Sequence, residues 1–539
     1  MAGWGHGLVL ARWGAFMGWF TAACLAMALV DPESESPEVL PELAIPPLPV
    51  ERPDWWSRVP RSQVFPQPGN FVTPPKREGY HSVRDWVLGV ERESLPKNPF
   101  SNLAPQPLPF FETNYRIVDP PGDDRSFPWL DRIKRVPLGD HWLFAAGGEY
   151  RWRYANEGNA RLTTIDNNYY LNRVRVFGDL WYEDKFRAYI EFISADIAHN
   201  DLPPVLPDRD PADFLDAFIE LKLGEIDNKA VALRAGRQEL LFGSQRLIGT
   251  LDWANTRRTF DGVRAYWRGE DHDFDLFWAQ PVIPSASGMA SPNENINLAG
   301  AWWSLRPQKD VWADIYALYT GNGMTVTTKG IPVAPGSIAT LGSRHAGRSD
   351  GWQWDAEVML QLGAIQGNGM VAGATTVGAG RIFADLPLSP SYWIYYDMAT
   401  GTRHPGQAPD STFQQLFPFS HYYLGWTDQV GRQNIRDFNQ HLYLYPAPWL
   451  TCWVQYHRFW LFSARDALYN AAAQVSRVSP NGSAGYDVGQ EVDLVLNFHL
   501  GPRSDILTGY CYLFGGDFLR LTGPSANSSL GFVQYQFRW

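Results

Sequence analysis

Polar and apolar side chains alternate one by one in many short segments between about residue 141 and the C-terminus. The segment at 149–154 reads EYRWRY, and the segment at 491–500 reads EVDLVLNFHL. A period of two residues places the two kinds of side chain on opposite faces of a β-strand, whereas an amphipathic helix needs a period of 3.6. The pattern therefore predicts an all-β architecture over 138–539.

The composition of the two faces indicates which kind of β-protein this is. In a soluble β-sandwich, the apolar face of each sheet is buried and the other face is exposed to solvent, where Thr, Ser and Lys are common. Here the polar face is rich in Arg with Asp and Glu, and the apolar face carries many of the 24 Trp and 24 Tyr. In lipid, strands can pair all their backbone groups only in a closed barrel. The chain is thus predicted to form a transmembrane antiparallel β-barrel of about 18 strands, with long loops at 320–350 and 366–420.

The end of the chain has the same two-faced pattern. Gln534, Gln536 and Arg538 share one face of a terminal strand, and the alternate positions up to Trp539 carry apolar or aromatic side chains. A last strand that ends on an aromatic residue resembles the C-terminal signal of bacterial outer-membrane β-barrels. It favours the outer membrane as the location and its lipid as a partner.

The beginning of the chain has the features of an export signal. Arg12 precedes an apolar run at 13–30, and Ala26-Met27-Ala28 has the small-x-small form that signal peptidase reads. We predict a signal peptide over 1–28. An uncleaved anchor helix and, at 21–24, an incomplete lipoprotein box are the alternatives.

Proline separates the next segment from the barrel. Residues 31–137 contain 21 of the 41 Pro, which favours extended chain without a core of its own. We predict a Pro-rich periplasmic extension or linker over 29–137. A small folded plug is the alternative, because aromatic pairs such as Phe110-Phe111 can dock onto another part of the molecule.

Charge and motifs argue against several functions. The net charge of -11 leaves no global basic field for nucleic acid. Asp271-His272-Asp273 lacks the geometry of a metal site, because neighbouring side chains on a strand point to opposite faces. The glycines at 367–373 do not have dinucleotide-binding spacing, and 481–485 misses the nucleophile-elbow pattern. We therefore predict no catalytic residue, no metal and no cofactor.

Several motifs resemble those of a known family. They are GRQELLFGSQRL at 236–247, RRTFDGVR at 257–264, GWTD at 425–428, GRQN at 431–434, DALY at 466–469 and GYDVGQEVD at 485–493. Together with the strand at 147–154, they are similar to the alginate-export family of bacterial outer-membrane porins. The similarity extends over about 141–539 and does not include the Pro-rich segment.

This resemblance implies a monomeric barrel that conducts an anionic polysaccharide outward through an arginine-lined lumen without an energy source. Periplasmic export components are further candidate partners. The physical reason for arginine is that its planar guanidinium holds a carboxylate through two hydrogen bonds and stays charged. The predicted lumen residues are Arg151, Arg153, Arg173, Arg175, Arg187, Arg237, Arg246, Arg258, Arg264, Arg432 and Arg458, with the acidic residues Glu149, Glu191 and Asp261.

Three alternatives remain at this stage. In the first, the arginines have a structural role alone and pair with Glu149, Glu191, Glu239 and Asp261 inside the barrel wall. The barrel can be a porin for uptake of small anions or sugars. It can also be a structural or adhesive surface protein that uses the Pro-rich segment for interaction.

Overall fold

The protein is described by a computed structural model that covers residues 77–94, 109–113, 115, 130, 133–322, 326–328, 331–333, 336–365, 367–404 and 408–539. The predicted signal peptide at 1–28 lies outside the described residues, as does most of the Pro-rich segment. Among the described residues, no helix combines the length and the apolarity needed to cross a membrane.

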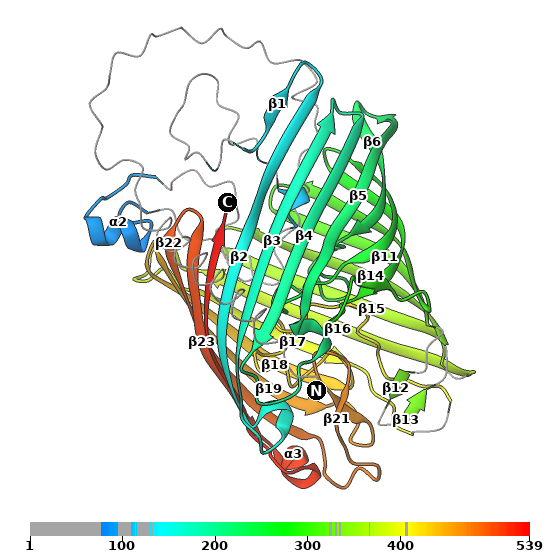
Figure 1. Cartoon of the computed structure of the whole chain (residues 1–539). Helices are drawn as coiled ribbons and strands as arrows, with labels where there is room; N and C mark the ends of the chain where they lie inside the picture. The colour runs from blue at the N-terminus through cyan, green and yellow to red at the C-terminus, as the bar shows by residue number, and fades with distance from the viewer. Residues whose placement is uncertain are drawn as a thin grey trace, which may run out of the picture.

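Eighteen antiparallel strands of the described chain close into one barrel, which confirms the predicted fold class (Figure 1). They are β2 (Trp142–Gly158), β3 (Asn167–Tyr182), β4 (Phe186–Ala198), β5 (Asp210–Ile226), β6 (Lys229–Gln238), β7 (Phe260–Arg268), β8 (His272–Ile283), β10 (Ile296–Gln308), β11 (Val311–Asn322), β14 (Gly336–Ser349), β15 (Trp352–Ile365), β16 (Asn368–Ile382), β17 (Ser391–Ala399), β18 (Ile435–Ala447), β19 (Leu450–Leu461), β22 (Asp487–Gly501), β23 (Ser504–Gly515) and β24 (Ser528–Arg538).

The other elements of the described chain are short. β1 (Val136–Leu138) pairs with β2, and β9 (Ser291–Pro292) pairs with β8. The remaining elements are the hairpins β12 (Val326–Thr328) with β13 (Ile331–Val333) and β20 (Ala467–Tyr469) with β21 (Val475–Val478), the helices α2 (Val83–Leu88) and α3 (Asp517–Thr522), and the 3-10 turns η2 (Phe110–Glu112), η4 (Ala160–Leu162) and η5 (Leu206–Asp208).

The barrel closes where its last strand meets its first. β24 runs antiparallel to β2, so the red C-terminal strand lies beside the cyan β2 in Figure 1. Beyond the ladder, Gly148 and Trp539 exchange backbone hydrogen bonds of 2.9 and 3.0 Å. A Cβ atom on Gly148 would collide with the indole of Trp539, so this position needs glycine for a close approach.

Loop length differs between the two ends and gives the orientation. Connections such as 227–228, 309–310 and 448–449 are short and lie at the end where β2 begins and β24 finishes. Most connections at the other end are long, including 239–259 and 400–434. Outer-membrane barrels have short periplasmic turns and long extracellular loops. The short-turn end is therefore the periplasmic end.

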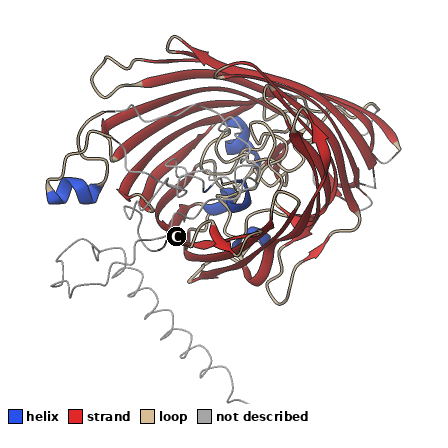
Figure 2. Cartoon of the chain, turned by 90° about the horizontal axis from the view of Figure 1, so that it is seen from above, coloured by secondary structure: helices blue, strands red, loops and turns tan. Residues whose placement is uncertain are grey.

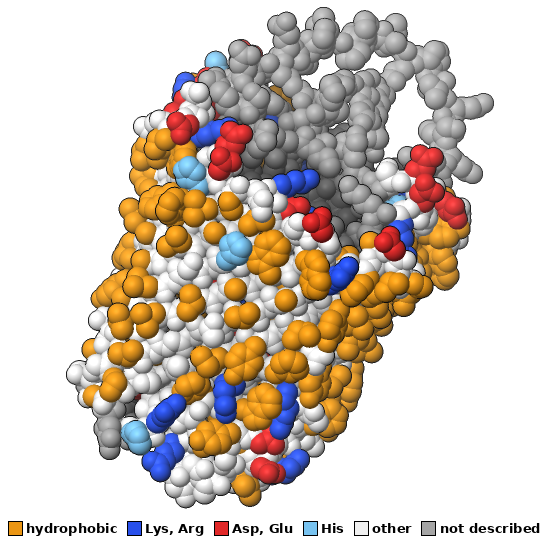
Figure 3. Space-filling model, turned by 180° about the vertical axis from the view of Figure 1, so that it is seen from behind, with side chains coloured by type: hydrophobic (Ala, Val, Ile, Leu, Met, Phe, Trp, Pro, Cys, Tyr) orange, Lys and Arg blue, Asp and Glu red, His pale blue; other side chains and the backbone are white. Residues whose placement is uncertain are grey.

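The outer wall is apolar and the inner face is polar. Side chains such as Leu276 and Val358 are more than half exposed on the outside. Figure 3 shows hydrophobic side chains over the wall and charged side chains gathered toward its two ends. Near the periplasmic turn at 269–271, His272 lies between Trp267 and Trp303 with ring centroids 4.9 and 6.3 Å away, as expected of an aromatic girdle.

Three barrel strands lie where long loops were predicted. Residues 366–420 contain β16 and β17, because small residues occupy both faces of β16 and hide the alternation. Gly378 and Gly380 of β16 leave space for the rings of Tyr395 and Trp393 on β17. Most of 320–350 is also strand, since β14 fills its second part.

Candidate functional site

A band of arginines crosses the inner face of neighbouring strands in the first third of the barrel. Arg151 on β2 lies directly opposite Arg173 on β3, and Arg234 on β6 lies directly opposite Arg264 on β7. Arg187 on β4 lies between these pairs and faces Glu220 of β5. The period of two brings all of these side chains to the inside, where each is at most 5% exposed.

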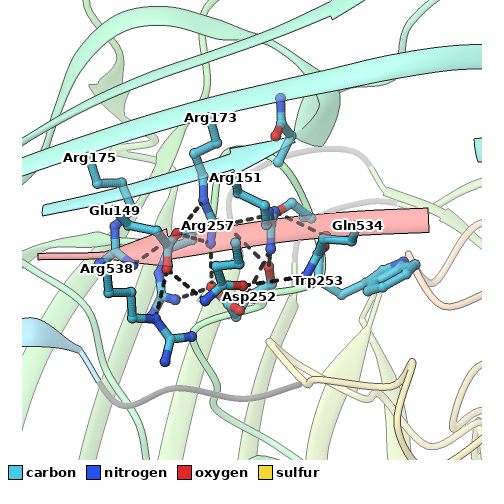
Figure 4. A network of polar contacts seen from close by, with 12 residues as sticks. Glu149, Arg151, Arg173, Arg175, Asp252, Trp253, Arg257, Gln534 and Arg538 are labelled. Atoms are coloured by element: carbon cyan, nitrogen blue, oxygen red, sulfur yellow. Dashed lines mark hydrogen bonds and ion pairs between the residues drawn. The ribbon is translucent and has the colours of Figure 1, made fainter. Parts of the chain in front are cut away.

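Carboxylates of the barrel wall form ion pairs with the arginines of this band. Arg173 holds Glu149 at 2.5 Å, and Arg175 holds Glu191 at 2.5 Å. Glu149 also accepts from Arg538 at 3.2 Å, so the last strand shares the network of the first two (Figure 4). Buried charges are stable only when paired and hydrogen-bonded, which explains the alternation of Arg with Glu.

The connection at 239–259, here called the inner loop, folds into the barrel and joins this network. Arg151 donates to the backbone carbonyls of Asp252 and Ala254 at 2.6 and 2.7 Å. The Asp252 carboxylate accepts from Arg173 at 2.9 Å and also from Arg257 of the loop itself. Burial alone would raise the pKa of Asp252, but Arg173, Arg257 and Arg151 outweigh it and hold that pKa well below its ordinary value.

Apolar packing also anchors the inner loop, on the neighbouring strands β8 and β10. Phe242 stacks on Phe277 of β8 and Trp302 of β10, with ring centroids 4.8 and 5.2 Å away. Phe242 and the nearby Ile248 are at most 1% exposed. The loop is therefore part of the packed interior, and Figure 2 shows loops inside the ring of strands.

Trp253 joins the inner loop to the second loop, which comprises residues 400–404 and 408–434. Its indole lies under the guanidinium of Arg153 at 3.5 Å and stacks on His421 at 4.1 Å. Burial lowers the pKa of His421 even though Asp428 opposes this, so the ring is neutral at pH 7. The result is a continuous stack from the barrel wall through both loops.

Arg258 makes a second connection between the two loops. It donates to the carbonyls of Phe417 and Pro418, the latter at 3.0 Å. Burial lowers the pKa of Arg258 to about 10, which still leaves it charged at neutral pH. Its hydrogen bonds all go to backbone carbonyls, so its role in this structure is to hold the loops together.

A second ionic cluster lies on the wall formed by β14 to β17. Arg246 of the inner loop contacts Asp355 at 2.9 Å and Glu357 at 3.1 Å, and Arg344 shares Asp355 at 2.8 Å. Arg432 of the second loop pairs with Asp397. Both loops are thus attached to this wall by charge-assisted hydrogen bonds.

A family model for alginate export matches residues 143–533. The chain belongs to the alginate export family. With its closed 18-stranded barrel, it is an outer-membrane porin of the bacterial envelope. A comparison with curated proteins gives no match.

Solved outer-membrane proteins are similar to this alginate export barrel. OccK5 (OpdH) of Pseudomonas aeruginosa is 10% identical, and the match covers 74% of this chain and 98% of that one with a TM-score of 0.50. The outer membrane protein opdK from Pseudomonas aeruginosa is 12% identical, with 73% and 99% covered and a TM-score of 0.49. At 10% identity, the likeness to OccK5 shows the fold alone.

The predicted site residues of the alginate export barrel fall into two groups. Arg237, Asp261 and Arg458 lie on the outward face, because they alternate with inward Gln238, Arg264 and His457. Arg237 pairs with Asp261 at 2.7 Å, and Arg458 pairs with Asp487 at 2.6 Å. The interior holds Arg151, Arg153, Arg173, Arg175, Arg187, Arg246, Arg258, Arg264, Arg432, Glu149 and Glu191.

Several interior charges are not among the residues predicted from the sequence. Arg234 and Arg344 belong to the inward sets of β6 and β14, and correct strand parity would have found them. Asp252 and Arg257 lie in the inner loop, which has no periodicity that could reveal which way a side chain points. Within the described ranges, no group of three or more His, Cys, Asp or Glu is arranged to hold a metal ion.

Proposed function

We propose that this barrel passively exports an anionic polysaccharide and that its inner arginine band provides the contacts along the path. The observation that carries the proposal is the row of inward guanidiniums from Arg151 to Arg264 across β2 to β7. A polyuronate has a carboxylate on each sugar, so many weak cationic contacts let it move where one deep site would trap it. We propose no catalytic role for the barrel.

The interior ion pairs fit such a path. Each arginine of the band contacts carboxylates or carbonyls of the protein, and a passing polymer would exchange with them one at a time. Arginine suits this exchange because it can hold a carboxylate through two parallel hydrogen bonds. In the structure described here the inner loop covers Arg151 and Arg173, so passage requires the loop to move aside.

Membrane and partners follow from the same geometry. The apolar outer wall fits outer-membrane lipid. Because β24 pairs with β2, the barrel sheet has no open edge whose backbone groups would have to pair with a second copy of the chain. We therefore propose a monomeric pore. Periplasmic export components would approach the short-turn end, where the polymer enters.

Planar-bilayer recording tests the proposal. Current through the wild-type pore should be blocked by an oligouronate and not by an uncharged dextran of equal length. Arg187→Gln combined with Arg264→Gln should weaken block by about tenfold or more, since a hydrogen bond to a charged group contributes about 1.5–3 kcal/mol. The matched control is Arg458→Gln, whose arginine lies on the outward face and should leave block unchanged.

The packing of the inner loop within the lumen supports a second candidate, which is uptake of small anions. That candidate predicts current block by a monomeric carboxylate and none by the oligomer. A barrel that remains silent at every voltage, with all loops in place or removed, would contradict both candidates and favour a structural or adhesive role.

A further inference from the structure

A short piece of the Pro-rich extension lies inside the barrel. This piece, here called the lumen segment, consists of residues 109–113 and 115 and includes η2. Phe110 and Phe111 are 2% and 5% exposed and belong to one apolar cluster with Tyr115 and three residues of the barrel. The lumen segment is thus packed as tightly as the core of a soluble domain.

The three barrel residues of this cluster form an aromatic surface on the inner face. They are Phe177 on β3, Tyr189 on β4 and Phe218 on β5. Phe110 lies against Phe177 with ring centroids 5.1 Å apart, and Phe111 meets Phe218 edge-on at 5.1 Å. An aromatic patch facing a water-filled lumen would be unfavourable, so this part of the wall is built to be covered.

Polar contacts fix the lumen segment in one position. Arg187 donates to the backbone carbonyl of Phe111 at 2.9 Å. The Glu112 carboxylate lies 3.6 Å from Arg234 and 3.8 Å from Arg264. Arg175 lies over the ring of Phe110 at 4.4 Å.

The two arginines around Glu112 also have closer partners in the wall. Arg234 holds Glu220 at 2.8 Å, and Arg264 holds Asp275 at 2.8 Å. Glu112 is therefore a third, more distant carboxylate that bridges two wall ion pairs. Such a contact is weaker than the pairs beneath it, and another carboxylate could replace it without breaking them.

Flat aromatic rings next to arginines provide the chemistry that binds an acidic sugar. The rings can stack on the C–H face of a pyranose, and the guanidiniums can hold its carboxylate. We propose that Phe177, Tyr189, Phe218, Arg234 and Arg264 form a subsite for one uronate unit, and that the lumen segment plugs it. In this arrangement Glu112 takes the place of the sugar carboxylate and Phe111 takes the place of the ring.

This inference rests on the proposed function, because it assigns one step of the same path. Chain on both sides of the lumen segment is attached to the periplasmic end of the barrel. On one side, Trp86 of α2 lies 5.3 Å from Trp449. On the other, Lys134 donates to the terminal carbonyl of Trp539 at 2.9 Å. The plug that we propose leaves the subsite while these flanking contacts stay in place.

Bilayer conductance in potassium chloride tests the plug without any polymer. A variant with Phe110→Ala, Phe111→Ala and Glu112→Gln should raise conductance by a factor of about two or more, because one of the segments that fill the lumen is released. The matched control is Trp86→Ala, which removes an aromatic contact of the same extension outside the lumen and should leave conductance unchanged. Equal conductance in the triple variant and the wild type would overturn the plug.

A reversible lock provides the second measurement. In the double variant Phe111→Cys with Phe218→Cys, a short bifunctional methanethiosulfonate reagent should cross-link the lumen segment to β5 and keep conductance low. Reduction of the cross-link should allow the lumen segment to leave the subsite and conductance to rise again. Phe111→Cys alone, treated in the same way, controls for reaction at native cysteines. Loss of this difference between the double and single variants would also count against the plug.

Oligouronate block separates this inference from the proposed function. The triple variant should be blocked at lower oligouronate concentration than the wild type, because the subsite is free, whereas dextran should have no effect on either. If conductance rises and oligouronate does not block, the plug stands and the proposed substrate is wrong. If block is seen in both proteins with equal conductance and equal affinity, the proposed function stands and the plug is wrong.

Discussion

The carboxylate of Asp252 accepts a hydrogen bond of 2.9 Å from the guanidinium of Arg173, although the two residues are 79 positions apart in the chain. One lies in the inner loop and the other on the wall strand β3. Through this pair a connection that could extend into solvent is held inside the barrel. The same pair places the inner loop over the arginine band.

Asp252→Asn should therefore release the inner loop. Removing one partner of a buried ion pair costs about 3–5 kcal/mol, because the remaining charge loses its compensation. Trypsin added from outside should cleave the loop at Arg246, Arg257 or Arg258 in the variant and leave the wild type intact. Asp487→Asn is the control, since its pair with Arg458 is about a third exposed and worth only about 0–1 kcal/mol. Equal protection of Asp252→Asn and the control would contradict the role of the pair.

The low pKa of Asp252 gives the pH range over which the loop stays attached. A carboxyl group whose pKa is lower in the folded state stabilises that state above its ordinary value of 3.8, and the contribution disappears as pH falls below that value. Conductance should thus be the same at pH 7.5 and pH 5, because both values are above the pH range in which the contribution of Asp252 is lost. A rise in conductance between these two values would show that another group controls the loop.

Trp253→Ala should loosen both loops together, because Trp253 stacks on Arg153 and His421 at once. Loss of a packed tryptophan costs about 3–5 kcal/mol, and about 3 kcal/mol corresponds to roughly a hundredfold change in an equilibrium. Amide hydrogen exchange over 419–426 should accelerate by about that factor. Trp303→Ala removes an outward tryptophan and should leave exchange in this stretch unchanged. Acceleration confined to 250–256 would mean that Trp253 does not couple the loops.

Leu276→Arg tests the position of the barrel in the membrane. Leu276 is outward on β8, and arginine at the middle of the bilayer costs about 2–4 kcal/mol. Leu223→Arg is a matched substitution near the periplasmic turn at 227–228, where the cost falls to about 0–1 kcal/mol. Guanidinium unfolding from lipid vesicles gives both values. If the two variants lose equal stability, the apolar band is not centred on Leu276.

Strand parity explains where the predicted site residues lie. Arg173 and Arg175 are on the inner face because their alternation with apolar neighbours is unbroken. Arg237 and Asp261 form their ion pair on the outside, close to the end where strands give way to long loops. Near such an end, a charged residue no longer marks the inner face, because charges are tolerated outside the apolar band as well.

The sequence alone determined the closed barrel, its approximate strand number and the chemistry of each face. These properties follow from a period of two and from the requirement that every backbone group in lipid be paired, both of which are local. Only the tertiary structure decided what fills the lumen. The inner loop, the second loop and the lumen segment have no repeating pattern, and Asp252, Trp253 and Glu112 acquire their roles through contacts with distant strands. Those contacts depend on shape and charge in three dimensions, which periodicity does not encode.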